Sequence, residues 1–183
     1  MKFKLGDKKL LFKGKYINLW GREFGDGSGN SHVWEYMEKR DVVFVLPVTD
    51  DGKAILIKNY RVPLEKYVIE TPAGLMDKES ESREDAVKRE LLEETGYEAS
   101  EWHALPPQPY RSGSSKNLMY GFIAKGLKKV KDGITGDDTE DISIMEVPLK
   151  DLVRLWLNPS DDIFFEPEII AMYQAGIEMG LLK

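Results

Sequence analysis

The stretch that decides the fold is Arg89-Glu90-Leu91-Leu92-Glu93-Glu94-Thr95-Gly96-Tyr97. Residues three and four apart share one face of a helix, so Glu90, Glu93 and Glu94 are predicted to project together. Val87 and Leu91 fall on another face, where they can pack against a sheet. Acidic side chains on one face repel each other, and a hard dication such as Mg²⁺ would reverse that cost. Acidic helix faces are also common and mostly just solvated, so this stretch alone leaves a metal site and a plain surface helix both open.

The flanking residues predict where this helix begins and ends. Ser82 is predicted as the N-cap with Asp85 as its capping partner, and Gly96 suits the position just past the last turn. The preceding segment Glu70-Thr71-Pro72-Ala73-Gly74 reads as a strand end that runs into a tight loop. Such a loop exposes backbone carbonyl groups, which are hard oxygen ligands like the carboxylates. Loop and helix together predict a cradle for a metal ion.

Further elements are predicted on both sides of this helix. Residues 42–48, 54–57, 67–69, 118–124 and 142–147 read as strands, and residues 149–157 and 167–179 as helices, with Pro167 in the first turn of the last one. Residues 1–40 read as a β-rich annex, with strands at 12–20 and 33–37 around a glycine-rich loop at 25–30. We therefore predict a mixed α/β (α+β) fold with helices packed on a mixed sheet, divided into an annex at 1–40 and a main domain at 41–183.

Composition and charge exclude several classes of protein. The chain has 183 residues, of which 42% are hydrophobic and 32% charged, and a net charge of −6, with no obvious basic face for nucleic acid. The lysines of residues 2–15 alternate with apolar residues and read as solvated strand edges, with a nucleic-acid arm as the weaker alternative. The absence of cysteine and the presence of only two histidines exclude thiolate sites, cysteine nucleophiles and histidine-rich metal clusters. No apolar run suits a signal peptide or a membrane span, so we predict no membrane partner and a cytoplasmic location.

The sequence resembles the Nudix hydrolase family. The family box runs from a glycine through a glutamate to Arg-Glu-apolar-x-Glu-Glu-x-Gly-apolar, and here it corresponds to Gly74, Glu81 and residues 89–97, which match at every fixed position. Six residues separate Gly74 from Glu81, one more than is usual, and this leaves open whether Glu81 or Glu79 pairs with Arg89. The resemblance implies an α/β/α sandwich around a mixed sheet.

The resemblance also implies roles for the residues of the box. Glu90 and Glu94 would be metal ligands, and the Ala73 carbonyl would be a further ligand. Glu93 would lie at or beside the metals and have a catalytic role. Glu81 and Arg89 would form a structural ion pair, and Gly74 and Gly96 would be structural positions. The implied cofactor is Mg²⁺, with Mn²⁺ as the alternative.

A looser resemblance extends to the branch of ADP-ribose and nucleoside diphosphate sugar pyrophosphatases. It depends on the annex, which in that branch helps to form an intertwined homodimer, on Asn59-Tyr60-Arg61, and on Glu70-Thr71-Pro72-Ala73-Gly74. It implies that Arg61 contacts substrate phosphates or ribose, with Glu70 in the same substrate site, and that Trp34 stacks on the base. A surface arginine at a strand end and a core tryptophan are the alternative interpretations.

Two loops carry the remaining expectations. By the same resemblance, the acidic loop at 136–141 would supply Glu140 as a further metal ligand, and Asp138 or Glu140 as the base that activates water. Residues 110–117 lack the proline and the acid that ADP-ribose enzymes often have there, and Arg111 or Lys116 could hold phosphate or a different sugar or base instead. The small-molecule substrate is therefore predicted as ADP-ribose or a similar nucleotide sugar. Dinucleoside polyphosphates, coenzyme A, a GDP-sugar and a catalytically silent nucleotide-sensing module stay open as alternatives.

Overall fold

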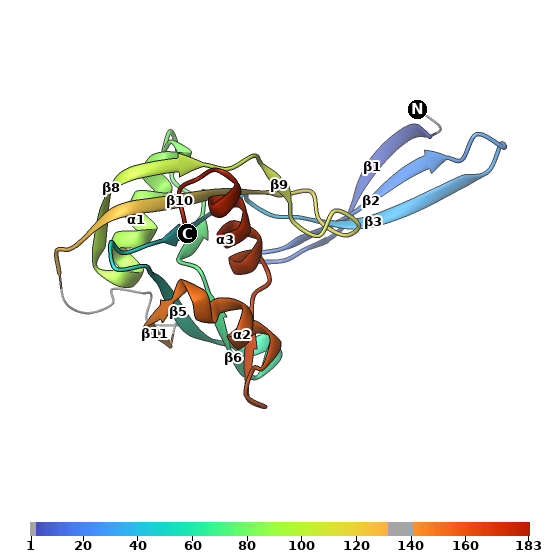
Figure 1. Ribbon diagram of the computed structural model, residues 1–183. Coiled ribbons are helices and arrows are strands. Elements are labelled where there is room, and N and C mark those ends of the chain that lie inside the picture. The colour runs from blue at the N-terminus through green and yellow to red at the C-terminus, as the bar shows by residue number, and fades with distance from the viewer. Residues whose placement is uncertain (1–2, 132–140) are drawn as a thin grey trace. The chain divides into compact units, whose positions relative to one another are not determined.

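The computed structural model describes residues 3–131 and 141–183 (Figure 1). The strands are β1 (Lys4–Lys13), β2 (Asn18–Gly25), β3 (Ser31–Glu38), β4 (Val42–Pro47), β5 (Lys53–Arg61), β6 (Lys66–Glu70), β7 (Ala73–Leu75), β8 (Tyr97–Ala104), β9 (Gln108–Pro109), β10 (Leu118–Lys129), β11 (Ile142–Pro148) and β12 (Ile163–Phe165). The helices are α1 (Arg83–Thr95), α2 (Leu152–Leu157) and α3 (Glu168–Glu178), with the short 3₁₀ turns η1 (Val62–Leu64) and η2 (Leu149–Asp151). No helix in these described ranges is long and apolar enough to cross a membrane.

These elements form three sheets within the described residues. One sheet has the order β1-β2-β3, the second has the order β7-β4-β10-β8 with β9 paired to β10, and the third has the order β11-β5-β6-β12. The chain divides into two compact units, which are described separately below. The first comprises residues 3–42 and Pro107–Met119, and the second comprises Val43–Pro106 and the described part of Tyr120–Lys183.

The first unit contains the antiparallel sheet of β1, β2 and β3. The single strand predicted over residues 12–20 is wrong, because the chain turns between β1 and β2, where the Gly14 N–H donates to the Ile17 carbonyl at 2.9 Å. A side chain at Gly14 would come within 2.6 Å of that carbonyl oxygen, so the turn requires glycine. The predicted loop at 25–30 is confirmed as the next turn, and the Asp26 carboxylate accepts hydrogen bonds there from the Ser28 N–H at 2.8 Å and the Asn30 amide at 3.0 Å.

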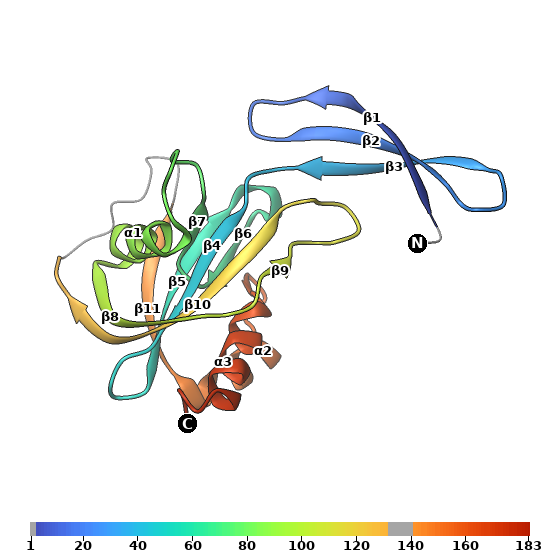
Figure 2. The ribbon, with the colours of Figure 1, turned by 90° about the horizontal axis from the view of Figure 1, so that it is seen from above.

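The second unit has its apolar core between helices and sheets. Its fully buried side chains come mainly from the central strands and α1: Val43, Val45, Leu46, Ile55, Leu56, Val87, Leu91 and Ile123. α1 and α3 lie on opposite sides of the strands (Figure 2). On one side the Arg83 guanidinium of α1 lies 3.7 Å from the centre of the Tyr120 ring, and on the other Gly176 of α3 packs against Ile123. The predicted mixed α+β sandwich is thus confirmed.

α1 has the boundaries that its sequence predicts. The Ser82 hydroxyl accepts a hydrogen bond from the Asp85 N–H at 3.0 Å, and Gly96 ends the helix in the left-handed conformation with φ 75°. Val87 and Leu91 are fully buried, which leaves the acidic positions of the helix for the face that carries the candidate site.

Candidate functional site

Two glutamates of α1 lie against the short strand β7, which follows β6. Glu94 is 6% exposed, and its Oε2 accepts a hydrogen bond from the Ala73 N–H at 3.0 Å. A side chain at Gly74 would overlap the carboxylate of Glu90, so β7 approaches the helix as closely as backbone alone allows. The structure therefore brings together Ala73, Gly74, Glu90 and Glu94, which are far apart in the sequence.

Arg89 links the acidic residues of this region. Its Nε and Nη2 donate to the two carboxylate oxygens of Glu81 at 3.0 and 3.1 Å, which is a bidentate pair. Its Nη1 donates to Glu90 at 2.6 Å and to Glu93 at 3.0 Å. These hydrogen bonds, led by those to Glu81, raise the pKa of the Arg89 guanidinium further above its already high value, so the charge is permanent. Arg89 thus holds Glu90 and Glu93 on the same side of the helix.

The choice between Glu81 and Glu79 is settled by the loop before the helix. Arg89 pairs with Glu81, and the extra residue in this loop does not prevent the pair. Ser80 adopts a left-handed conformation with φ 68°, and the Glu81 N–H donates to the Lys78 carbonyl at 3.4 Å. The chain therefore makes a tight turn directly before Glu81.

The electrostatics of Glu90 favour a cation nearby. Burial raises the pKa of the Glu90 carboxyl, and the negative charges of Glu93 and Asp77 raise it further, while the hydrogen bond and charge of Arg89 oppose this shift. A second positive charge would stabilise the ionised carboxylate. The side-chain donors here are carboxylate oxygens, which suit hard cations such as Mg²⁺ or Mn²⁺.

The described residues supply only part of a ligand set. Across residues 3–131 and 141–183, no three histidine, aspartate or glutamate side chains converge as they would around a metal ion. Glu90 and Glu93 are both bonded to Arg89, and Glu94 is bonded to the Ala73 N–H, so these carboxylates are held by hydrogen bonds instead. The remaining candidates, Asp138 and Glu140, lie outside the described residues.

Arg61 and Glu70, which were both predicted in the substrate site, form an ion pair. The Arg61 Nε donates to Glu70 Oε1 at 2.6 Å, and its Nη2 donates to Glu70 Oε2. The Glu70 side chain is 3% exposed, whereas the Arg61 side chain is 45% exposed. A buried carboxylate thus orients a guanidinium that solvent and a ligand can reach.

One neighbour of this pair was missed in the sequence. Glu166 follows β12, and its half-buried side chain interacts with the charges of Glu70 and Arg61. The segment Glu166-Pro167-Glu168 indicated only the start of a helix, because Pro167 is typical of a first turn. A glutamate directly before such a proline and next to the short apolar segment 163–165 was the available signal.

The first unit contains the three other substrate candidates. The Trp34 indole is 54% exposed and donates to the Gly113 carbonyl at 2.8 Å. The Lys116 ammonium pairs with Glu38 at 2.7 Å, beside a cavity of about 320 Å³. Arg111 has φ 50°, and its guanidinium lies 5.8 Å from the centre of the Tyr110 ring. These residues share one unit, and Glu38 balances the charge of Lys116.

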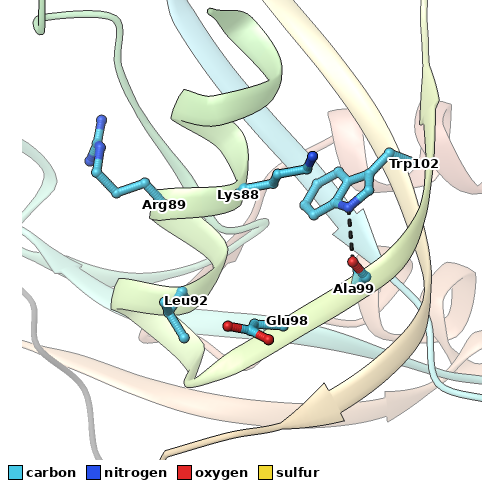
Figure 3. A pocket seen from close by; sticks show the side chains of 6 residues that line it. All are labelled: Lys88, Arg89, Leu92, Glu98, Ala99 and Trp102. Atoms are coloured by element: carbon cyan, nitrogen blue, oxygen red, sulfur yellow. Dashed lines mark hydrogen bonds between the residues drawn. The ribbon is translucent and has the colours of Figure 1, made fainter. Parts of the chain in front are cut away.

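A separate cavity of about 370 Å³ lies between α1 and β8 (Figure 3). It is lined by Lys88, Arg89, Leu92, Glu98, Ala99 and Trp102. Lys88 points toward Trp102, with its Nζ 5.9 Å from the centre of the ring, whereas the Arg89 guanidinium points away from the indole. The lining includes none of the glutamates that meet Ala73 and Gly74, so this cavity is distinct from the candidate metal site.

Comparison with known proteins identifies the family. The model of the NUDIX domain matches residues 38–166. The chain belongs to the NUDIX family. All of the acidic positions on α1 and residues 73–74 of β7 lie inside the NUDIX match, whereas Trp34 lies before it.

Individual NUDIX relatives cover most of the chain. The protein is 34% identical over 148 residues to the ADP-ribose pyrophosphatase of Bacillus subtilis (strain 168), which covers 81% of this chain and 80% of that protein. It is 29% identical over 144 residues to the methanol dehydrogenase activator of Bacillus methanolicus, at 79% and 77% coverage. A crystal structure of an ADP compounds hydrolase has the same fold, with a TM-score of 0.82, 23% identity, and coverage of 100% of this chain and 98% of that one.

Proposed function

We propose that this NUDIX protein hydrolyses the diphosphate bond of a nucleoside diphosphate sugar such as ADP-ribose, giving a nucleoside monophosphate and a sugar phosphate. The observation that carries the proposal is the close approach of Ala73 and Gly74 to Glu94 and Glu90. It brings the acidic side chains and the backbone of residues 73 and 74 to one place, beside an arginine that holds two of the acids. The similarity to a protein named ADP-ribose pyrophosphatase supports the choice of substrate.

The residues present fit a magnesium site in the chemistry of their donors. Mg²⁺ would be held by Glu90, Glu94 and the carbonyl of Ala73, with Glu93 beside it and Glu140 as a further ligand, and Mn²⁺ is the alternative ion. When bound, the metal neutralises the diphosphate and lowers the pKa of water. The proton of the attacking water would pass to Asp138 or Glu140, or else to Glu93.

The chain's own basic and aromatic groups would bind the rest of the substrate. Arg61, oriented by Glu70, would contact the phosphates, and its planar guanidinium suits phosphate oxygens. In the first unit, Trp34 would stack on the base, and Arg111 and Lys116 would favour the anionic part of the ligand. Glu81 would act indirectly, because it fixes the guanidinium that holds Glu90 and Glu93.

Three further statements belong to the same proposal. Residues 1–40 would form an annex to the main domain at 41–183, and the annex would join two copies of the chain in a homodimer. The protein would work in the cytoplasm on a small-molecule nucleotide, with neither nucleic acid nor membrane as a partner. The exposed apolar side chains of the annex, such as Phe12 (63% exposed) and Val33 (60% exposed), support the homodimer.

A substrate panel tests the proposed reaction. The purified protein would be incubated with ADP-ribose, a GDP-sugar, a dinucleoside polyphosphate and coenzyme A, each with and without Mg²⁺, and the products separated by chromatography. We expect AMP and ribose phosphate from ADP-ribose, and only when the metal is present. Nucleotide binding with no product from any of these compounds would instead indicate a sensing module.

A single variant tests the role of the helix glutamates. Glu94→Gln keeps an oxygen that can accept the Ala73 hydrogen bond but removes the negative charge, so we expect turnover to be abolished with little loss of stability. Glu98→Gln on β8 is the matched control and should behave as the wild type. Near-normal turnover in Glu94→Gln would refute the assignment.

A further inference from the structure

The Trp34 indole on β3 is held by a loop that is distant in the sequence. Its Nε1–H donates to the Gly113 carbonyl at 2.8 Å, although the side chain is 54% exposed. The ring of Phe24 lies beside it, with 6.1 Å between the two ring centres. Exposed side chains usually change rotamer freely. The hydrogen bond to Gly113 therefore fixes a ring that solvent and a ligand can both reach.

The backbone around Gly113 forms a closed turn that is attached to β3. The Met37 N–H of β3 donates to the Ser114 carbonyl at 2.8 Å. The Arg111 carbonyl accepts hydrogen bonds from the N–H groups of Ser114 and Ser115 at 2.8 and 3.0 Å. Arg111 itself has φ 50°, a conformation that is uncommon for residues other than glycine. The position of the Gly113 carbonyl thus depends on the shape of this turn.

Two buried side chains stabilise the turn. Between residues 111 and 117, all of which the structure describes, only Ser115 (8% exposed) and Asn117 (4% exposed) are buried. The Ser115 hydroxyl donates to the Asn117 Oδ1, and the Tyr110 N–H donates to the Asn117 carbonyl at 3.2 Å. A buried polar group that loses its partner is costly, so this pair favours one conformation of an otherwise exposed turn.

We propose that Ser115 and Asn117 are positioning residues that hold Trp34 ready for the nucleobase of the substrate. This inference rests on the function proposed above, in which Trp34 stacks on the base. Binding costs less when a contacting side chain is already ordered, because its rotamers are not lost at that moment. These contacts all lie within the first unit, whereas the helix glutamates belong to the second. Loss of the pair should therefore raise KM and leave kcat nearly unchanged.

Steady-state kinetics with ADP-ribose provide the main test. Ser115→Ala and Asn117→Ala each remove one partner of the same hydrogen bond, and KM should rise about fivefold in both, the cost of ordering one side chain on binding. Ser114→Ala is the matched control, because this serine is exposed and its backbone hydrogen bonds would remain. A wild-type KM in Ser115→Ala, or a fall in kcat as large as the rise in KM, overturns the proposal.

A double-mutant cycle tests whether Ser115 acts through Trp34. Trp34→Phe keeps an aromatic ring but removes the N–H that donates to Gly113, so KM should rise about as much as in Ser115→Ala. The double variant should be little worse than either single variant, because both changes remove the same constraint. Additive effects would show that Ser115 acts elsewhere, and would overturn the proposal. Should Ser115→Ala and Asn117→Ala both fail to fold, a wild-type KM in Trp34→Phe overturns it equally.

Inhibition by the two expected products distinguishes positioning of Trp34 from general damage to the site. AMP carries the base, whereas ribose 5-phosphate does not. In Ser115→Ala the inhibition constant of AMP should rise together with KM, and that of ribose 5-phosphate should stay at the wild-type value. An equal loss of affinity for both compounds would mean that the pair supports the site as a whole, which contradicts the proposal.

A measurement without turnover separates this inference from the proposed function. Among the indole N–H resonances of the four tryptophans in nitrogen-15 NMR spectra, the one missing from Trp34→Phe belongs to Trp34. Ser115→Ala should shift this resonance and speed its exchange with water, whereas Ser114→Ala should not. If no compound is hydrolysed, the proposed reaction fails, and calorimetric affinity for ADP-ribose then replaces KM. An unchanged Trp34 resonance in Ser115→Ala, or an unchanged affinity, overturns the inference by itself.

Discussion

The absence of a side chain at Gly74 allows the carboxylate of Glu90 to lie against the backbone there. The carboxylate of Glu90 occupies the space that a methyl group at position 74 would need. Any other residue there would displace either β7 or the carboxylate. Because β7 also donates the Ala73 hydrogen bond to Glu94, a shift of β7 would reach both glutamates.

Gly74→Ala is therefore expected to damage the site more than the fold. The added methyl group should displace Glu90, and Mg²⁺-dependent turnover should fall at least about tenfold, as it does when groups that orient a metal ligand are lost. Overpacking of this kind costs about 1–3 kcal/mol of stability, which thermal unfolding would measure. Gly25→Ala is the control, since a methyl group there meets its nearest atom only at 3.7 Å. Equal activity and stability in the two variants would contradict the structural role of Gly74.

At the scale of single residues, the sequence predicts which residues belong to the site better than it predicts which side chains they contact. The acidic positions of α1 followed from spacing and resemblance, whereas Arg61 and Glu70 were expected only as substrate-binding residues and their ion pair was not predicted. Which glutamate pairs with Arg89 stayed open, because the shape of the loop before Glu81 could not be predicted. Ser80 adopts φ 68° there, a conformation that is rare for serine and that the sequence does not indicate. Glu166 was not predicted because its position depends on the pairing of β12 with β6, a contact between segments almost a hundred residues apart.

At the scale of elements, the N-cap of α1 connects local sequence to the candidate site. Ser82→Ala removes the acceptor of the Asp85 N–H, so the free energy of unfolding should fall by about 1 kcal/mol. Chemical denaturation would measure this loss. Ser82→Thr keeps a hydroxyl in the same place and should recover most of the stability. A loss as large in Ser82→Thr as in Ser82→Ala would show that the cap does not stabilise the helix.

The elements differ in how clearly their sequences predict them. α1 carries an N-cap, a buried stripe and a terminal glycine, and its boundaries were predicted. β8 was missed because it is an edge strand of its sheet with mostly polar and half-buried residues, so it lacks a continuous apolar run. The strand predicted over residues 12–20 was wrong because apolar residues continue across the turn at Gly14, and only the backbone contact with Ile17 marks the break.

At the scale of the whole molecule, the first unit exposes several large apolar side chains to solvent. Leu11 and Val33 flank Gly21, where an added side chain would lie within 3.3 Å of both. They are 44% and 60% exposed, and Phe12 next to Leu11 is 63% exposed. Contiguous exposed apolar patches on soluble proteins often mark interaction surfaces. A second copy of the chain presents the same patch, so a two-fold symmetric contact could cover both.

Sedimentation equilibrium over a range of concentrations would test the proposed homodimer. The wild type should sediment with twice the chain mass of 20.9 kDa. Val33→Asp places a charge in the patch and should shift the equilibrium toward the monomer, because an unpaired charge is costly to bury at an interface. Val153→Asp is the matched control, since Val153 is 41% exposed on α2, outside the first unit. A wild type that remains at the mass of one chain would rule out the homodimer. A Val33→Asp variant as dimeric as the control would show that a different surface joins the two copies.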